Sequence, residues 1–156
     1  KFKRSLVFMW FDGEEKGLLG STHWTANPTL DIAGCVAMIN CDMIGRNEVT
    51  QILVGVEKDE KGKAKYQKWA AVLVAAEKKF GVPFDWKGAD FLIRRSDHWK
   101  FMEKGVPSAF FTGGLHADYH TERDDADRIN FQKEELIGKI VFYIIAKCAD
   151  GTTPLK

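Results

Sequence analysis

Apolar residues are arranged along the chain in two ways, as short runs and as longer segments with helical spacing. The runs occur at residues 5–11, 34–40, 51–56 and 106–112, and most are bounded by Gly, Asp or charged residues. Short runs of this kind are typical of strands buried on both faces of a sheet. We predict a buried strand at each of them and a further short strand at residues 82–86.

Helical spacing predicts four helices. The clearest covers about residues 66–80, where Trp69 and Leu73 lie on one apolar stripe and Gly81 provides a stop signal. The others are expected at residues 17–26, 96–105 and 132–148. Ser96 has the residue type and position of an N-cap for the helix that follows it.

The alternation of strands and helices indicates an α/β fold. We expect a three-layer sandwich with a mostly parallel or mixed central sheet, and residues 1–156 as a single domain. An apolar content of 45% is ordinary for a globular protein and excludes a disordered or collagen-like chain. The 23 basic residues are balanced by 22 acidic ones without a basic block, so nucleic acid is not an expected partner.

Two further classes are disfavoured. The chain contains no apolar stretch of about 18 residues, so no transmembrane segment is expected. The three cysteines, Cys35, Cys41 and Cys148, stand in apolar surroundings, which favours buried free thiols over a single disulfide.

Polar side chains that could perform chemistry follow the predicted strands. Glu14 and Glu15 come after the first run, Asp42 after the second, and His120 lies in the polar loop of residues 113–130. Ligands of α/β sheets bind at the carboxyl ends of strands. Carboxylates and an imidazole gathered there would suit a hydrolytic zinc site. Plain alternatives remain: a solvated turn for the glutamates, a turn or cap for Asp42, and an ordinary loop histidine.

Four sequence blocks carry a resemblance to a known family. They are GEEKGLLGS at residues 13–21, NCDMIG at 40–45, RSDH at 95–98 with the later GVP at 105–107, and YHT at 119–121 followed by Asp124 or Asp125. In this order they resemble the M28 family of zinc aminopeptidases. The resemblance extends from about residue 5 to residue 148.

The resemblance implies specific roles. Glu14 would be the general base, and Glu15, Asp42 and His120 would be zinc ligands. Ser96, Asp97 and His98 would contact the ligands or simply begin a helix, and His116 and Tyr119 would line the substrate pocket or belong to a plain loop. In such a site two zinc ions lower the pKa of a water molecule, Glu14 takes its proton and passes it to the leaving amine. The substrate would be a peptide with a free N-terminus.

The sequence also departs from the family. A complete site in the family needs one more His and a metal-bridging Asp upstream of the glutamate pair, and residues 1–13 contain no His. We therefore expect this chain to correspond to the C-terminal part of a catalytic domain, with one zinc ion or none and weak or no activity. An incomplete sheet would also favour self-association. Export is common in the family, which favours a secreted or periplasmic parent protein.

Two alternatives stay open. One is a different enzyme on the same scaffold, a carboxypeptidase or a glutaminyl cyclase. The other is a non-catalytic binding module that keeps the fold and has lost the metal site.

Overall fold

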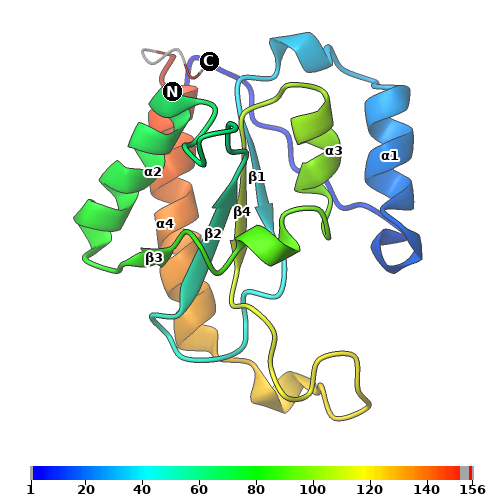
Figure 1. Cartoon of the computed structure of the whole chain (residues 1–156), viewed down its shortest axis with the longest axis vertical. Coiled ribbons are helices and arrows are strands. Elements are labelled where there is room, and N and C mark those ends of the chain that lie inside the picture. The colour runs from blue at the N-terminus through cyan, green and yellow to red at the C-terminus, as the bar shows by residue number, and fades with distance from the viewer. Residues whose placement is uncertain (1, 152–154, 156) are drawn as a thin grey trace.

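The described residues contain four strands, which form one mixed sheet. The structure is a computed structural model that describes residues 2–151 and residue 155. The strands are β1 (Met38–Cys41), β2 (Ile52–Val56), β3 (Phe84–Asp85) and β4 (Ser108–Thr112). Their order is β1-β4-β2-β3, with β1 parallel to β4, β2 parallel to β3, and β2 antiparallel to β4 (Figure 1). The strands predicted at 34–40, 51–56, 82–86 and 106–112 are thus confirmed, with shorter bounds.

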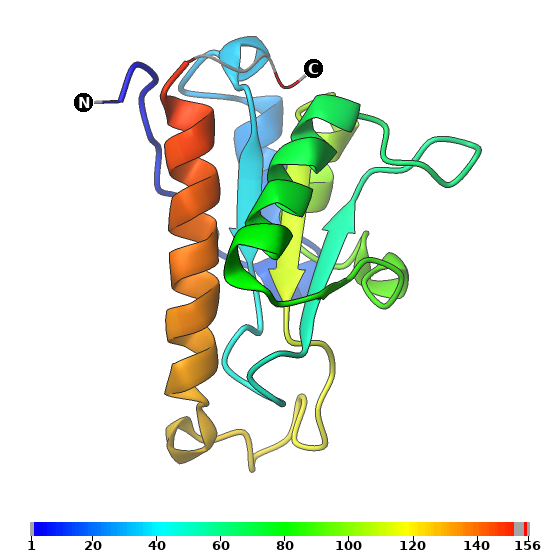
Figure 2. The same cartoon turned by 90° about the vertical axis from the view of Figure 1, so that its left-hand side faces the viewer.

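Helices cover both faces of this sheet, which confirms the three-layer α/β fold. The helices are α1 (Leu19–Ala26), α2 (Gln67–Phe80), α3 (His98–Glu103) and α4 (Phe131–Ala149). Figures 1 and 2 show α2 and α4 side by side on one face, and α3 with α1 beyond it on the other. Short 3-10 helices occur at Glu14–Lys16, Ile32–Gly34, Asp90–Leu92 and Ala126–Arg128.

The main hydrophobic core lies between the sheet and the pair α2 and α4. Leu73 of α2 and Ile137, Ile140 and Ile144 of α4 are fully buried against the strands. Their spacing of three and four residues places them on one helix face, as the apolar stripes predicted. The glycine after α2, Gly81, adopts a left-handed conformation with φ of 65°, which ends the helix as predicted.

The strand predicted at residues 5–11 is wrong. The segment is extended but forms no strand, and Phe8 and Trp10 are 70% and 88% exposed. Within the described part of the chain, no backbone hydrogen bond joins residues 5–11 to a neighbouring strand. Figure 1 shows the segment in blue, passing the sheet towards the turn before α1. A strand needs a paired neighbour, and the apolar run alone does not supply one.

The cysteine prediction is confirmed in part. All three thiols are free, but only Cys148 is buried, whereas Cys35 is half-buried and Cys41 is exposed at the edge strand β1. In the part of the chain that the structure describes, no helix is long and apolar enough to cross a membrane.

Candidate metal centre

The sheet topology brings three chain segments to one cavity. Because β1 and β4 are adjacent and parallel, the segments that follow them leave the sheet at the same end. Asp42 follows β1 directly, and the loop after β4 carries His120. The cavity there is lined by Glu14, Glu15, Asp42, Met43, Leu92, Arg95, Phe110, Tyr119, His120 and Asp124. Five of the predicted site residues therefore share it: Glu14, Glu15, Asp42, Tyr119 and His120.

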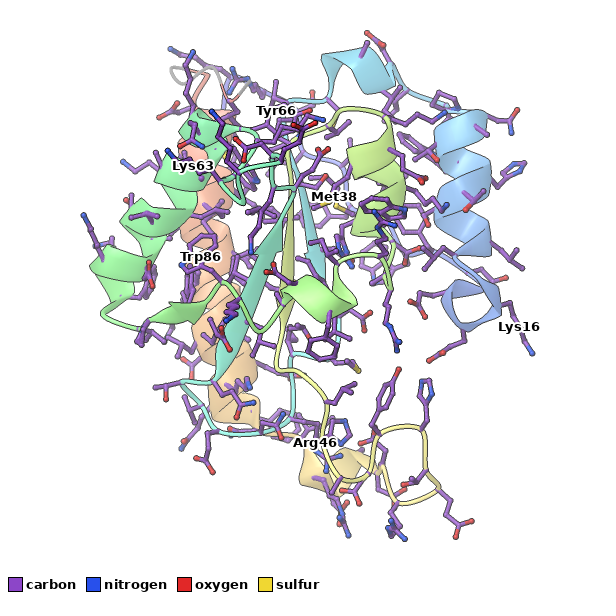
Figure 3. All side chains as sticks on the ribbon, viewed as in Figure 1. Lys16, Met38, Arg46, Lys63, Tyr66 and Trp86 are labelled. Atoms are coloured by element: carbon purple, nitrogen blue, oxygen red, sulfur yellow. The ribbon has the colours of Figure 1, made fainter. Side chains whose placement is uncertain are left out.

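Two of the predicted ligands are in direct contact across this cavity. Nε2 of His120 lies 2.9 Å from Oε1 of Glu15, and both side chains are more than half exposed. Lys16, labelled in Figure 3, belongs to the 3-10 turn that carries Glu15. His120 has a left-handed backbone with φ of 56°, a conformation that residues other than glycine adopt rarely. Its placement must therefore be held by the surrounding loop.

Glu14 has the environment of a proton acceptor. It is half-buried, and its pKa is raised from about 4.5 to about 7, first by burial and then by the negative charges of Asp42, Glu15 and Asp97. Both causes disfavour the charged carboxylate. A general base with a pKa near neutrality is the kind that enzymes use at physiological pH.

Asp42 is oriented by two consecutive hydrogen bonds that involve Ser96 and Asn40. The hydroxyl of Ser96 donates to Oδ2 of Asp42 at 2.7 Å, and the amide of Asn40 donates to the Ser96 hydroxyl, also at 2.7 Å. The prediction that Ser96 caps a helix is wrong: the N-cap position belongs to Asp97, which makes no capping bond through its side chain. The Ser96 hydroxyl orients Asp42 instead.

His98 and Asp97 lie behind this chain of hydrogen bonds. His98 is fully buried, stacks on Phe110 with ring centroids 4.2 Å apart, and has Nδ1 3.3 Å from the Asn40 amide. Burial lowers its pKa to about 4, so the ring is neutral at pH 7. The carboxyl of Asp97 is also buried, and burial together with the charge of Asp42 raises its pKa.

Of the two remaining predicted residues, Tyr119 and His116, one lines the cavity and the other does not. Tyr119 lines the cavity and stacks on the His120 ring at a centroid distance of 3.8 Å. Burial and the charge of Glu15 raise its pKa. His116 does not line the cavity; its Nε2 lies 3.5 Å from Asp124, and its ring meets Tyr119 edge-on.

Comparison with protein families decides what kind of chain this is. The model of "Peptidase family M28" matches residues 1–145. The chain belongs to peptidase family M28. No curated protein matches its sequence. Solved structures of enzymes share its fold.

Three of these structures illustrate the range. An aminopeptidase from Aneurinibacillus sp. strain AM-1 is 26% identical, with a TM-score of 0.69 over 94% of this chain and 34% of its own. A zinc aminopeptidase from Bacillus subtilis is 23% identical, with a TM-score of 0.72 over 90% of this chain and 35% of its own. A Porphyromonas gingivalis glutaminyl cyclase is 21% identical, with a TM-score of 0.62 over 90% of this chain and 50% of its own. The M28 chain thus spans a third to a half of the length of these structures.

The M28 cavity contains the donor types that zinc takes. Carboxylate oxygen and imidazole nitrogen are zinc donors, and Glu15 and His120 bring one of each to within 2.9 Å of the other. Asp42 lines the same cavity, with Oδ1 not engaged by Ser96. Among the described residues, however, no group of three or more His, Cys, Asp or Glu is gathered closely enough to hold a metal. Of the three predicted ligands, Glu15 and His120 are thus in direct contact, whereas Asp42 lies on the wall of the same cavity without joining them.

Sequence reasoning missed several residues at the M28 site. Arg95 and Asp124 line the cavity, although they stood only as letters in the family motifs. Arg46, directly after the NCDMIG block, was not singled out at all, yet it pairs with Asp118 and Asp124 of the His120 loop. The sequence did contain a signal for this ion pair. Arg46 lies four residues after the candidate ligand Asp42, and the loop that carries His120 contains aspartates of opposite charge.

Proposed function

We propose that this M28 chain carries the zinc-binding part of an aminopeptidase, which hydrolyses the N-terminal peptide bond of its substrate. Glu14 is the general base, and Glu15 and His120 hold zinc with Asp42 on the adjoining wall. The observation that supports this most is the shared cavity. It brings a carboxyl with a pKa near 7 beside a carboxylate–imidazole pair whose atoms are 2.9 Å apart.

The chain's own residues supply the acid–base chemistry. Zinc, when bound, would polarise the substrate carbonyl and lower the pKa of water. Glu14 accepts the proton of the attacking water and donates it to the departing amine. Ser96 orients Asp42 through its 2.7 Å hydrogen bond.

The charge of the cavity supports cleavage at the amino end. Four carboxyl side chains line it, those of Glu14, Glu15, Asp42 and Asp124, against one arginine and one histidine. A free α-ammonium group is attracted to such a site, whereas a free carboxylate is repelled. This favours an aminopeptidase over a carboxypeptidase.

The experiment that tests the proposal is replacement of the base. Because this chain alone is expected to be weakly active at most, the substitution is made in the full-length protein. There we expect Glu14→Gln to lower hydrolysis of leucine p-nitroanilide at least about a hundredfold, the typical contribution of a general base, while zinc binding is kept. Glu122→Gln, which changes an exposed glutamate of the His120 loop, is the matched control and should leave hydrolysis unchanged. Hydrolysis at the wild-type rate in Glu14→Gln would reject Glu14 as the base.

A second candidate function has its own support. The fold likeness to a glutaminyl cyclase covers 90% of this chain. Cyclisation of a peptide with N-terminal Gln, measured beside leucine p-nitroanilide hydrolysis, separates the two enzymes. A protein that binds zinc and peptide but performs neither reaction would be a binding module.

We also infer that the chain self-associates. The exposed side chains of Val7, Phe8 and Trp10 line a groove together with Trp24 and Leu30. Contiguous apolar surface favours association, and so does an extended segment that, within the described residues, pairs with no strand.

A further inference from the structure

Asp42 and His120 lie on different segments of the chain, so contacts between these segments must fix the distance between the two side chains. Asp42 follows β1, whereas His120 belongs to the loop after β4. The His120 side chain is 53% exposed, and its backbone is left-handed. Such a conformation costs free energy and persists only when the surrounding structure imposes it. The contacts of the loop therefore decide where the imidazole lies.

Asp118 is the point at which the loop is fixed. Its carboxylate is only 9% exposed, and one oxygen, Oδ2, accepts hydrogen bonds from Arg46 at 2.6 Å and Arg128 at 2.8 Å. Arg123 approaches the other oxygen at 3.5 Å. Arg123 and Arg128 belong to the same loop region as Asp118, so their contacts are internal to it. Arg46 alone among these three arginines joins Asp118 to the segment that follows β1.

Arg46 is itself held at both its side chain and its backbone. A second nitrogen of its guanidinium donates to Asp124, further along the loop. Its backbone carbonyl accepts a 2.6 Å hydrogen bond from the ammonium of Lys133, a fully buried residue in the first turn of α4. Charge-assisted hydrogen bonds of this kind are the stronger ones in proteins. Figure 3 shows Arg46 beside the loop after β4, below the sheet.

The two residues of this ion pair are close in sequence to the candidate ligands. Arg46 lies four residues after Asp42, and Asp118 lies two residues before His120. We propose that Arg46 is a positioning residue, whose ion pairs with Asp118 and Asp124 place His120 opposite Asp42 and Glu15. The inference rests on the proposed zinc site for its functional meaning, although its structural part can be tested without metal.

The test compares Arg46→Gln with Arg128→Gln. Each removes one guanidinium from the same oxygen of Asp118, but only the first cuts the link between the two segments. With zinc alone as the probe, in competition with a chromophoric chelator, we expect Arg46→Gln to weaken binding about 10–100-fold, the usual effect of losing a residue that orients a ligand. We expect Arg128→Gln to change it less than about threefold, by comparison with that range.

A metal-free measurement separates this inference from the proposed function. Amide hydrogen exchange of residues 113–121 should accelerate clearly in Arg46→Gln and little in Arg128→Gln. Equal exchange in the two variants would overturn the inference, whatever zinc does. Absence of zinc binding in the wild type would instead reject the proposed site and leave the exchange result to decide the role of Arg46. If Arg46→Gln does not fold, Arg46→Lys keeps the charge, loses the two-pronged contact and is expected to show the same order of effects.

Discussion

Two apolar segments of this protein look alike in sequence and behave in opposite ways. Ile52–Val56 forms β2, lies between β4 and β3, and is buried along its whole length. Residues 5–11 are at least as apolar, yet they form no strand, and Trp10 is 88% exposed. The difference lies in the neighbours, because β2 has a hydrogen-bonded strand on each side. A buried strand therefore requires a second segment that pairs with it. An apolar run shows only that the segment could be buried.

The same contrast separates the packed core from the functional rim. The core side chains are confined by several neighbours each, whereas Glu15 and His120 are more than half exposed and depend on a few polar contacts. Substitutions in the core should therefore change stability, and those at the rim should change binding.

The largest effect on stability is expected when a buried phenylalanine is replaced, in comparison with an exposed one. Phe111 of β4 is fully buried and meets Phe84 edge-on, whereas Phe8 of the N-terminal segment is 70% exposed. Phe111→Ala should lower the free energy of unfolding by about 3–5 kcal/mol, because it removes a large side chain from a packed core. Phe8→Ala, the same chemical change, should stay within about 0.5 kcal/mol. Urea denaturation measures both, and similar losses would show that residues 5–11 are packed after all.

A comparable effect should appear as acid sensitivity. The pKa of His98 falls from about 6.5 unfolded to about 4 folded because the ring is buried. Between these values only the unfolded chain takes up the proton, so stability falls as pH drops from 6.5 to 4 and this contribution is absent above 6.5. The loss amounts to about 3 kcal/mol at most, at roughly 1.4 kcal/mol per pKa unit.

The control for this prediction removes the buried ring. His98→Gln should flatten the fall in unfolding free energy between pH 6.5 and 4 relative to wild type, whereas His23→Gln, a change at an exposed histidine, should keep it. An unchanged pH profile in His98→Gln would mean that other groups cause the acid sensitivity.

The smallest effect on stability, with a clear effect on association, is expected at the exposed segment. Trp10→Ser should leave the free energy of unfolding within about 0.5 kcal/mol of wild type. It should nevertheless raise the dissociation constant for self-association about tenfold or more, because an exposed tryptophan carries much of an apolar interface. Light scattering over a micromolar concentration series measures this, and a wild-type monomer throughout that series would contradict self-association.

Most of the fold could be predicted from sequence because it depends on local periodicity. The stripe of Ile137, Ile140 and Ile144 and the run at Ile52–Val56 both indicate their own burial. The strand at residues 5–11 was mispredicted because an apolar run does not tell whether another segment pairs with it, and in the described part of the chain none does. Ser96 was mispredicted for a related reason, since its hydroxyl is engaged by Asp42, 54 residues away.

The candidate site divides in the same way. The segments carrying Asp42 and His120 could be placed at one end of the sheet, because the parallel neighbouring strands β1 and β4 end together. Glu15 shares their cavity although residues 5–11, from which its position was predicted, form no strand. The residues that hold these segments, Arg46 and Asp118, could not be placed, because an ion pair across 72 positions leaves no periodic trace in the sequence.

The central claim is that Glu15 and His120 hold zinc. It is tested most directly by a zinc titration of the protein and of His120→Ala, with His23→Ala as the control. The account predicts one zinc ion per chain, binding at least about tenfold weaker in His120→Ala and unchanged in His23→Ala. Absence of zinc binding, or equal affinity in wild type and His120→Ala, would contradict it.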